Sequence, residues 1–62
     1  MNDEQFLNAV RLLAEGHNVV INWHQSDIQN RVLMFDKGLK CTEDDLVDFI
    51  TELDRVFGEY IC

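Results

Sequence analysis

The carboxy-terminal third of the chain, residues 42–62, has the periodicity of one α-helix with two contrasting sides. Its apolar residues recur three and four positions apart, a spacing that gathers side chains along one side of a helix. They are Leu46, Phe49, Ile50, Leu53, Phe57, Tyr60 and Ile61. Thr42 is the predicted N-cap, and Asp45 stands where it can return the hydrogen bond of a capping box. Because such a helix is stable only when its apolar side is covered, the rest of the chain has to supply an apolar surface.

The amino-terminal segment predicts a second amphipathic helix over about residues 3–15. Asn2 is the expected N-cap, and the Gln5 side chain is placed to return a bond to the Asn2 backbone. The apolar side of this helix consists of Phe6, Ala9, Val10 and Leu13. Gly16 is predicted to end the helix in the left-handed conformation, which glycine adopts without a Cβ penalty.

Between the two helices the period changes from helical to alternating. Residues 18–24 are rich in β-branched and aromatic side chains, and alternation places Val19, Ile21 and Trp23 on one face. Residues 31–36 form a second run of the same kind, which favours a β-hairpin with a long loop. The Asp36-Lys37-Gly38 sequence is predicted to be the turn that follows it.

Residues 27–37 also fit a helix that Ser26 would cap and Gly38 would end. The hairpin is favoured because a single strand at residues 18–24 would leave its backbone N–H and C=O groups without partners. The predicted fold is therefore a single small α+β domain over residues 1–62, of order α-β-β-α, with two helices packed on a β-hairpin.

The small size of the chain favours self-association. A two-stranded hairpin is barely stable alone and leaves two open edges, and a chain of 62 residues has little core to support it. We therefore expect a homodimer, through either the hairpins or the carboxy-terminal helices. Two cysteines are too few for a disulfide framework, and no signal peptide is recognisable, so a cytoplasmic protein is expected. The longest apolar run, residues 32–35, is too short to span a membrane.

The net charge of −7 restricts the classes of partner. It argues against direct binding of nucleic acid or of anionic membranes, both of which require clustered bases. It suits docking on a basic protein surface. The carboxylates gather between Glu43 and Glu59, where Arg55 is the one base. The predicted partner-binding carboxylates are Asp44, Asp45, Asp48, Glu52 and Glu59.

Most of these carboxylates follow one side of the predicted helix in a row roughly 21 Å long. Their separation along the axis, about 4.5–6 Å, is comparable with phosphate spacing along a nucleic acid strand. The sequence thus suggests an inhibitor that occupies the nucleic-acid groove of a basic protein. In size and acidity alone, the chain resembles the inhibitors that bacteriophages and mobile elements make against host nucleic-acid enzymes. The alternative is an ordinary solvated helix face.

Chemistry at a metal or a nucleophile is not expected. The metal-capable side chains match no zinc spacing: His17, His24, Cys41 and Cys62. A chain this short also encloses little of a substrate pocket. We therefore expect no enzyme, no cofactor and no native metal. The rival to the acidic module is a small homodimeric structural or regulatory protein with an apolar working surface around Trp23, Phe35 or Tyr60, and with incidental acidity.

Overall fold

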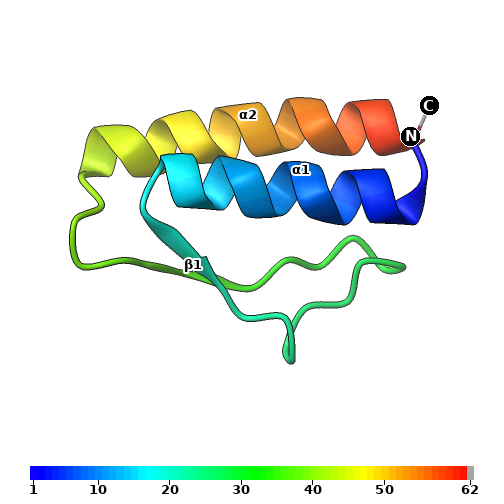
Figure 1. The fold of residues 1–62 in the computed structure, drawn as a ribbon, viewed down its shortest axis with the longest axis horizontal. Coiled ribbons are helices and arrows are strands. Elements are labelled where there is room, and N and C mark those ends of the chain that lie inside the picture. The colour runs from blue at the N-terminus through cyan, green and yellow to red at the C-terminus, as the bar shows by residue number, and fades with distance from the viewer. Residues whose placement is uncertain (62) are drawn as a thin grey trace.

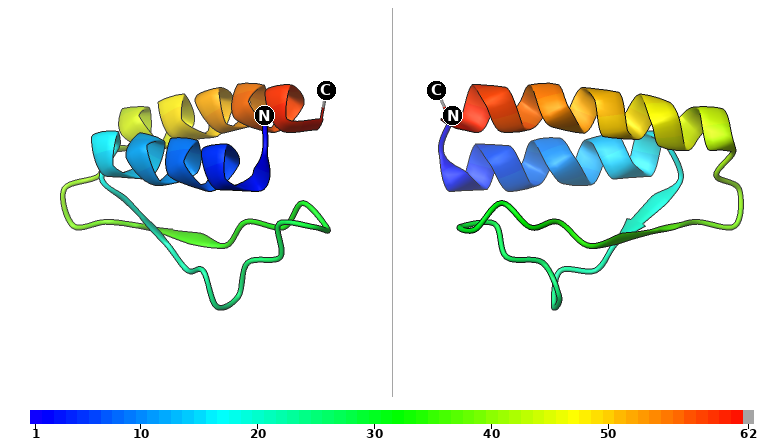
Figure 2. Two further views of the ribbon diagram at one scale, coloured as in Figure 1. Left: turned by 45° about the vertical axis from the view of Figure 1, so that its right-hand side comes forward. Right: turned by 180° about the vertical axis from the view of Figure 1, so that it is seen from behind.

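The computed structural model describes residues 1–61. Its elements are, in chain order, α1 (Asp3–Gly16), β1 (Val19–Ile21), β2 (Phe35–Lys37) and α2 (Glu43–Ile61). The two helices run antiparallel, so that the start of α1 lies beside the end of α2, and the hairpin covers one side of the helix pair (Figures 1 and 2). This confirms the predicted α+β fold of order α-β-β-α.

Both predicted capping boxes are present. The Asn2 side chain accepts from the Gln5 N–H at 2.8 Å, and the Gln5 side chain accepts from the Asn2 N–H at 3.1 Å. At the start of α2, the Thr42 hydroxyl accepts from the Asp45 N–H at 3.1 Å, and the Asp45 carboxylate accepts from the Thr42 N–H at 3.3 Å. Each box satisfies backbone donors that the first turn of a helix leaves without partners.

The predicted end of α1 is wrong in one respect. Gly16 belongs to the helix, and no described glycine has a positive φ. The left-handed residue is Asn18, with φ 58°, two positions later. Asparagine tolerates this conformation better than most side chains, so the chain turns into β1 without needing a glycine there.

Both strands are shorter than predicted: β1 lies within its predicted run, whereas β2 is shifted toward the carboxy terminus. They pair antiparallel, with Val20 opposite Asp36 and Ile21 opposite Phe35. The turn predicted at residues 36–38 is wrong, because Asp36 lies within β2 and pairs with β1. Gly38 instead meets the backbone just before β1: its N–H donates to the Asn18 carbonyl at 3.0 Å. A Cβ on Gly38 would lie 2.3 Å from that oxygen, so the close approach of two backbones accounts for the glycine.

The connection between the strands excludes the alternative helix over residues 27–37. Asp27 and Val32 exchange backbone hydrogen bonds of 2.7 and 2.8 Å, which closes a small turn at the tip. The Ser26 hydroxyl accepts from the Met34 N–H at 2.9 Å and so holds the two arms of the connection together. Polar side chains that bond to nearby backbone in this way compete with helix formation.

The core lies between the helix pair and the inner face of the hairpin. The buried apolar residues of the described chain are Phe6, Val10, Ala14, Val19, Cys41, Phe49 and Leu53. Phe35 from β2 meets Phe49 of α2 with ring centroids 5.1 Å apart. At the other end of α2, Tyr60 stacks on Phe6 at 4.3 Å. Aromatic contacts in the core therefore connect both helices and the hairpin.

The buried side of α2 differs from the predicted stripe. Phe49 and Leu53 are buried as expected, but Ile50 and Ile61 are 44% and 50% exposed, and Val56 packs against the core instead. The buried side of α2 is thus rotated about the helix axis, away from Ile50 and toward Val56. The sequence of α2 alone cannot set this rotation, because the position of α1 decides which flank of the stripe is covered.

Candidate functional site

Most of the net negative charge of the molecule lies on α2. Residues 43–61 hold seven carboxylates and one arginine, a net −6, whereas residues 1–42 hold five carboxylates and four bases, a net −1. We use "acidic surface" for the predicted partner-binding carboxylates on α2, which are Asp44, Asp45, Asp48, Glu52 and Glu59. Asp44, Asp48 and Glu59 are exposed, while Asp45 and Glu52 are partly covered. Because the opposite side of α2 is packed in the core, these side chains have fixed backbone positions.

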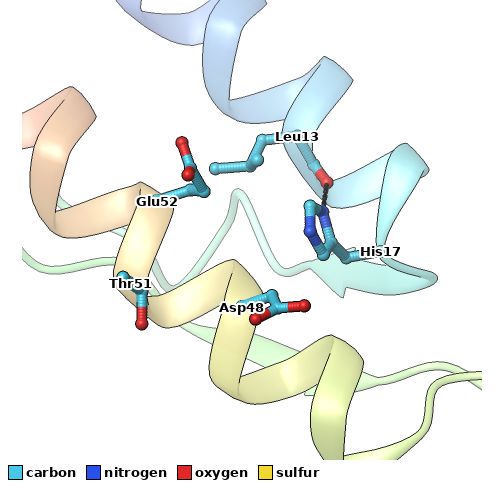
Figure 3. Close-up of a pocket in the computed structure, with 5 residues that line it drawn as sticks. All are labelled: Leu13, His17, Asp48, Thr51 and Glu52. Atoms are coloured by element: carbon cyan, nitrogen blue, oxygen red, sulfur yellow. Dashed lines mark hydrogen bonds between the residues drawn. The ribbon is translucent and has the colours of Figure 1, made fainter.

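The amino-terminal half of the acidic surface borders a cleft between the helices. Leu13 of α1 and His17, the residue that follows α1, form one wall, and Asp48, Thr51 and Glu52 of α2 form the other, around a volume of about 420 Å³. Figure 3 shows the two carboxylates extending from α2 on the side where α1 lies. The cleft therefore presents two carboxylates beside an imidazole at an open surface.

The His17 ring is oriented by a hydrogen bond to the last turn of α1. Its Nδ1 lies 2.9 Å from the Leu13 carbonyl oxygen (Figure 3). Since a carbonyl only accepts, Nδ1 carries the proton in this bond, and Nε2 is the acceptor of the neutral ring. In the sequence, His17 stands out only as one of four metal-capable side chains. Its place beside Asp48 and Glu52 depends on the pairing of the helices, which no local sequence signal reports.

Arg55 interrupts the carboxy-terminal half of the acidic surface. Its Nε lies 3.9 Å from carboxylate oxygens of both Glu52 and Glu59, and its side chain is 70% exposed. Pairs this long and this exposed contribute little to stability. They do, however, place a positive charge inside the predicted row. The uninterrupted part of the acidic surface is therefore its amino-terminal half, around Asp44 and Asp48.

Trp23 lies outside the core, at the edge of a second hollow. It is 42% exposed and lines a volume of about 360 Å³ with Leu7, Asn8 and Arg11 of α1. The strand ends at Ile21, so the predicted alternation does not reach Trp23. Of the three side chains proposed for an apolar working surface, Phe35 and Tyr60 pack against the core, and Trp23 stays accessible.

Tyr60 joins the two ends of the described chain. Its hydroxyl donates to the Asp3 carboxylate at the start of α1. This hydrogen bond, with smaller contributions from burial and from the negative charge of Asp3, raises the pKa of Tyr60 above its ordinary value. The contact fastens the end of α2 to α1, and we assign it a structural role.

Comparison with known proteins gives no relative: no protein-family model matches the chain, no curated protein matches its sequence, and no solved structure matches its fold. Within residues 1–61, no three His, Cys, Asp or Glu side chains come close enough together to hold a metal ion. Neither described helix is both long and apolar enough to cross a membrane. The function therefore has to be inferred from the geometry and charge of this chain.

Proposed function

We propose that the protein is a non-enzymatic interaction module that docks the acidic surface of α2 on a basic partner protein. The observation that carries this proposal is the division of charge: one helix holds −6 of the net −7, and its apolar side is committed to the core. A fixed array of like charges raises the rate of encounter with an oppositely charged surface and disfavours acidic partners.

The cleft beside α2 suggests how the partner is recognised. A lysine or arginine side chain that enters it would meet the carboxylates of Asp48 and Glu52 together. Hydrogen bonds between such ionised groups are about twice as strong as neutral ones. Leu13 would contact the aliphatic stem of the entering side chain, as long basic side chains commonly lie along apolar surface.

A narrower version of the proposal is an inhibitor that substitutes for the phosphates of a nucleic acid. The position of Arg55 between Glu52 and Glu59 counts against a ladder along the whole helix. The phosphate-like part is then the first half of α2, with Asp44, Asp45 and Asp48. The partner class for this version is a nucleic-acid-binding protein whose groove is lined by Lys and Arg.

The test is competition for purified nucleic-acid-binding proteins, with labelled DNA as the displaced probe. Displacement should weaken as salt rises, because exposed charges are screened. The double variant Asp48→Lys/Glu52→Lys should lose displacement while its circular dichroism stays that of the parent. Glu4→Lys/Glu15→Lys is the matched control, since it reverses two exposed charges on α1 and changes the net charge equally. If both variants lose activity to the same extent, net charge alone is responsible and the docking surface is disproved.

The exposure of Trp23 favours a second candidate, a structural or regulatory protein that binds through the hollow beside α1. Tryptophan is over-represented among residues that dominate binding energy. For such a protein, Trp23→Ala would remove binding, whereas Asp48→Lys/Glu52→Lys would leave it intact. A comparison of Trp23→Ala with Asp48→Lys/Glu52→Lys therefore distinguishes the two candidates.

A further inference from the structure

The hollow beside α1 combines apolar walls with a cation. Leu7 and Trp23, both exposed, supply the apolar walls, and Asn8 and Arg11 supply the polar groups, around a volume of about 360 Å³. A mostly apolar lining with a few polar groups that fix orientation is typical of sites for small ligands. The exposed Trp23 ring adds a flat surface on which a second ring can stack. The hollow therefore has the chemical character of a site for a small aromatic ligand.

Two segments that are separate in the chain form this hollow. Leu7 and Arg11 stand four positions apart, so they project from the same side of α1. Phe6 and Val10 beside them are buried, which fixes the rotation of α1. Trp23 comes from the segment directly after β1, the strand that contacts α1. The backbone positions on both sides of the hollow are therefore set by packed elements.

The guanidinium of Arg11 has donors available for an anion. Its Nη2 donates to the Asn8 side-chain oxygen at 3.3 Å. Glu15 stands four positions further along α1, yet within residues 1–61 the ion pairs are those that Arg55 makes. A guanidinium has five N–H donors in a fixed fork that matches a carboxylate. Arg11 is therefore oriented by a neutral partner and can still bind a carboxylate from outside the chain.

Charge and space select a small anion as the ligand. Arg11 repels a basic ligand, which the net −6 of α2 would attract elsewhere. The residues that line the hollow come from α1 and from the segment after β1, so Arg11 is nearer to the ligand than the carboxylates of α2, which salt screens. A long acidic peptide would meet Glu4 and Glu15, one turn before Leu7 and one turn after Arg11. A small anion fits between these two carboxylates.

From these observations we infer that the hollow is a binding site for a small aromatic carboxylate. The ring of the ligand stacks on Trp23 and contacts Leu7. Its carboxylate accepts two N–H hydrogen bonds from Arg11, which Asn8 orients. This site goes beyond the docking of the acidic surface, with which it shares no residue, and it gives the hollow a ligand of defined chemistry.

The experiment uses phenylacetate as the ligand and the fluorescence of Trp23 as the signal, since Trp23 is the one tryptophan of the chain. The parent should bind with a dissociation constant on the order of 1 mM, because an exposed hollow covers only part of the ring. Phenylacetamide, which has the same shape without the charge, should bind about tenfold more weakly. Arg11→Gln should raise the dissociation constant of phenylacetate about tenfold and leave that of phenylacetamide unchanged. Arg55→Gln is the matched control, since it removes the same charge from α2 and should bind phenylacetate as the parent does.

A measurement on the unaltered protein guards against a variant that fails to fold. With phenylacetate, the methyl resonances of Leu7 should shift together with the indole N–H of Trp23, while the methyl resonances of Val47 on α2 stay constant. The inference is overturned if phenylacetate does not saturate the Trp23 signal, or if phenylacetamide binds equally well. Equal losses in Arg11→Gln and Arg55→Gln also overturn it, because net charge would then be responsible. DNA displacement depends on α2, so this inference and the proposed function fail independently.

Discussion

Replacing Gly38 by alanine tests the closest backbone approach in the hairpin. The new Cβ would lie 2.3 Å from the Asn18 carbonyl oxygen and 3.2 Å from its carbon. Both atoms belong to backbone, so no flexible side chain can move aside. The strands have to separate at the point where the Gly38 N–H donates to the same oxygen at 3.0 Å. The substitution therefore introduces a steric clash and removes a hydrogen bond together.

The expected loss is large compared with the stability of the domain. Overpacking costs typically about 1–3 kcal/mol, and a lost backbone hydrogen bond about 1 kcal/mol more. The expected loss of stability is therefore about 2–4 kcal/mol. The total free energy of unfolding for a chain of this length is roughly 3–9 kcal/mol. In a domain this small, each kcal/mol lowers the melting temperature by about 4–8 °C.

The other two glycines provide controls of opposite sign. Gly16 and Gly58 both lie in helices, and a Cβ on either would meet no atom within 4 Å. Gly16→Ala and Gly58→Ala should each stabilise the protein by about 0.5–1 kcal/mol, because alanine restricts the unfolded chain and favours helix. Replacement of glycine by alanine is thus expected to destabilise the protein at Gly38 and to stabilise it at Gly16 and Gly58, because the space around the new Cβ differs.

The assay is urea unfolding of the three variants and the parent, followed by far-UV circular dichroism. All samples should have the same protein concentration, since association would add a concentration-dependent contribution to stability. Equal midpoints for Gly38→Ala and the parent would refute the close approach of Gly38 to Asn18. A loss of stability of similar size in Gly58→Ala would show that the effect of alanine does not come from contacts of its Cβ.

Two further predictions concern the hairpin tip and the joined chain ends. Arg31 has φ 61°, so Arg31→Gly should stabilise the protein by up to about 1 kcal/mol in the same assay. The raised pKa of Tyr60 means that its contact with Asp3 stabilises the fold below pH 10.0 and is lost as pH rises through the folded value. Asp3→Asn should lower the tyrosine titration midpoint, followed by UV absorbance, whereas Glu4→Gln should leave it unchanged.

The features that the sequence predicted correctly depend on residues close together in the chain. The capping boxes at Asn2 and Thr42 each involve a partner three positions away, so their geometry follows once a helix begins. The two helices and the order of elements were likewise readable from periodicity. Alternation correctly grouped Val19 and Ile21, which both pack in or against the core, but Trp23, predicted on the same face, lies beyond the strand and is exposed.

The features that the sequence missed depend on how distant segments meet. The role of Gly38 comes from its contact with Asn18, twenty positions away, and its neighbours suggested only a local turn. Ile50 is exposed and Val56 is covered, a choice that depends on what packs against α2 and not on its own periodicity. The cleft that joins His17 to Asp48 has the same origin, since its walls come from different helices. Periodicity identifies a buried side of a helix but does not fix its rotation against a neighbour.

The double role of α2 links the stability of the fold to binding. The helix closes the core with Phe49 and Leu53, yet it carries carboxylates that repel one another at three- and four-residue spacing. Added salt screens this repulsion, so it should stabilise the free protein while it weakens a complex held by opposite charges. A basic partner relieves the same repulsion directly and stabilises the folded state by mass action. Opposite responses to salt, in melting temperature and in affinity, are therefore the physical signature of an acidic helix that both completes a core and binds a partner.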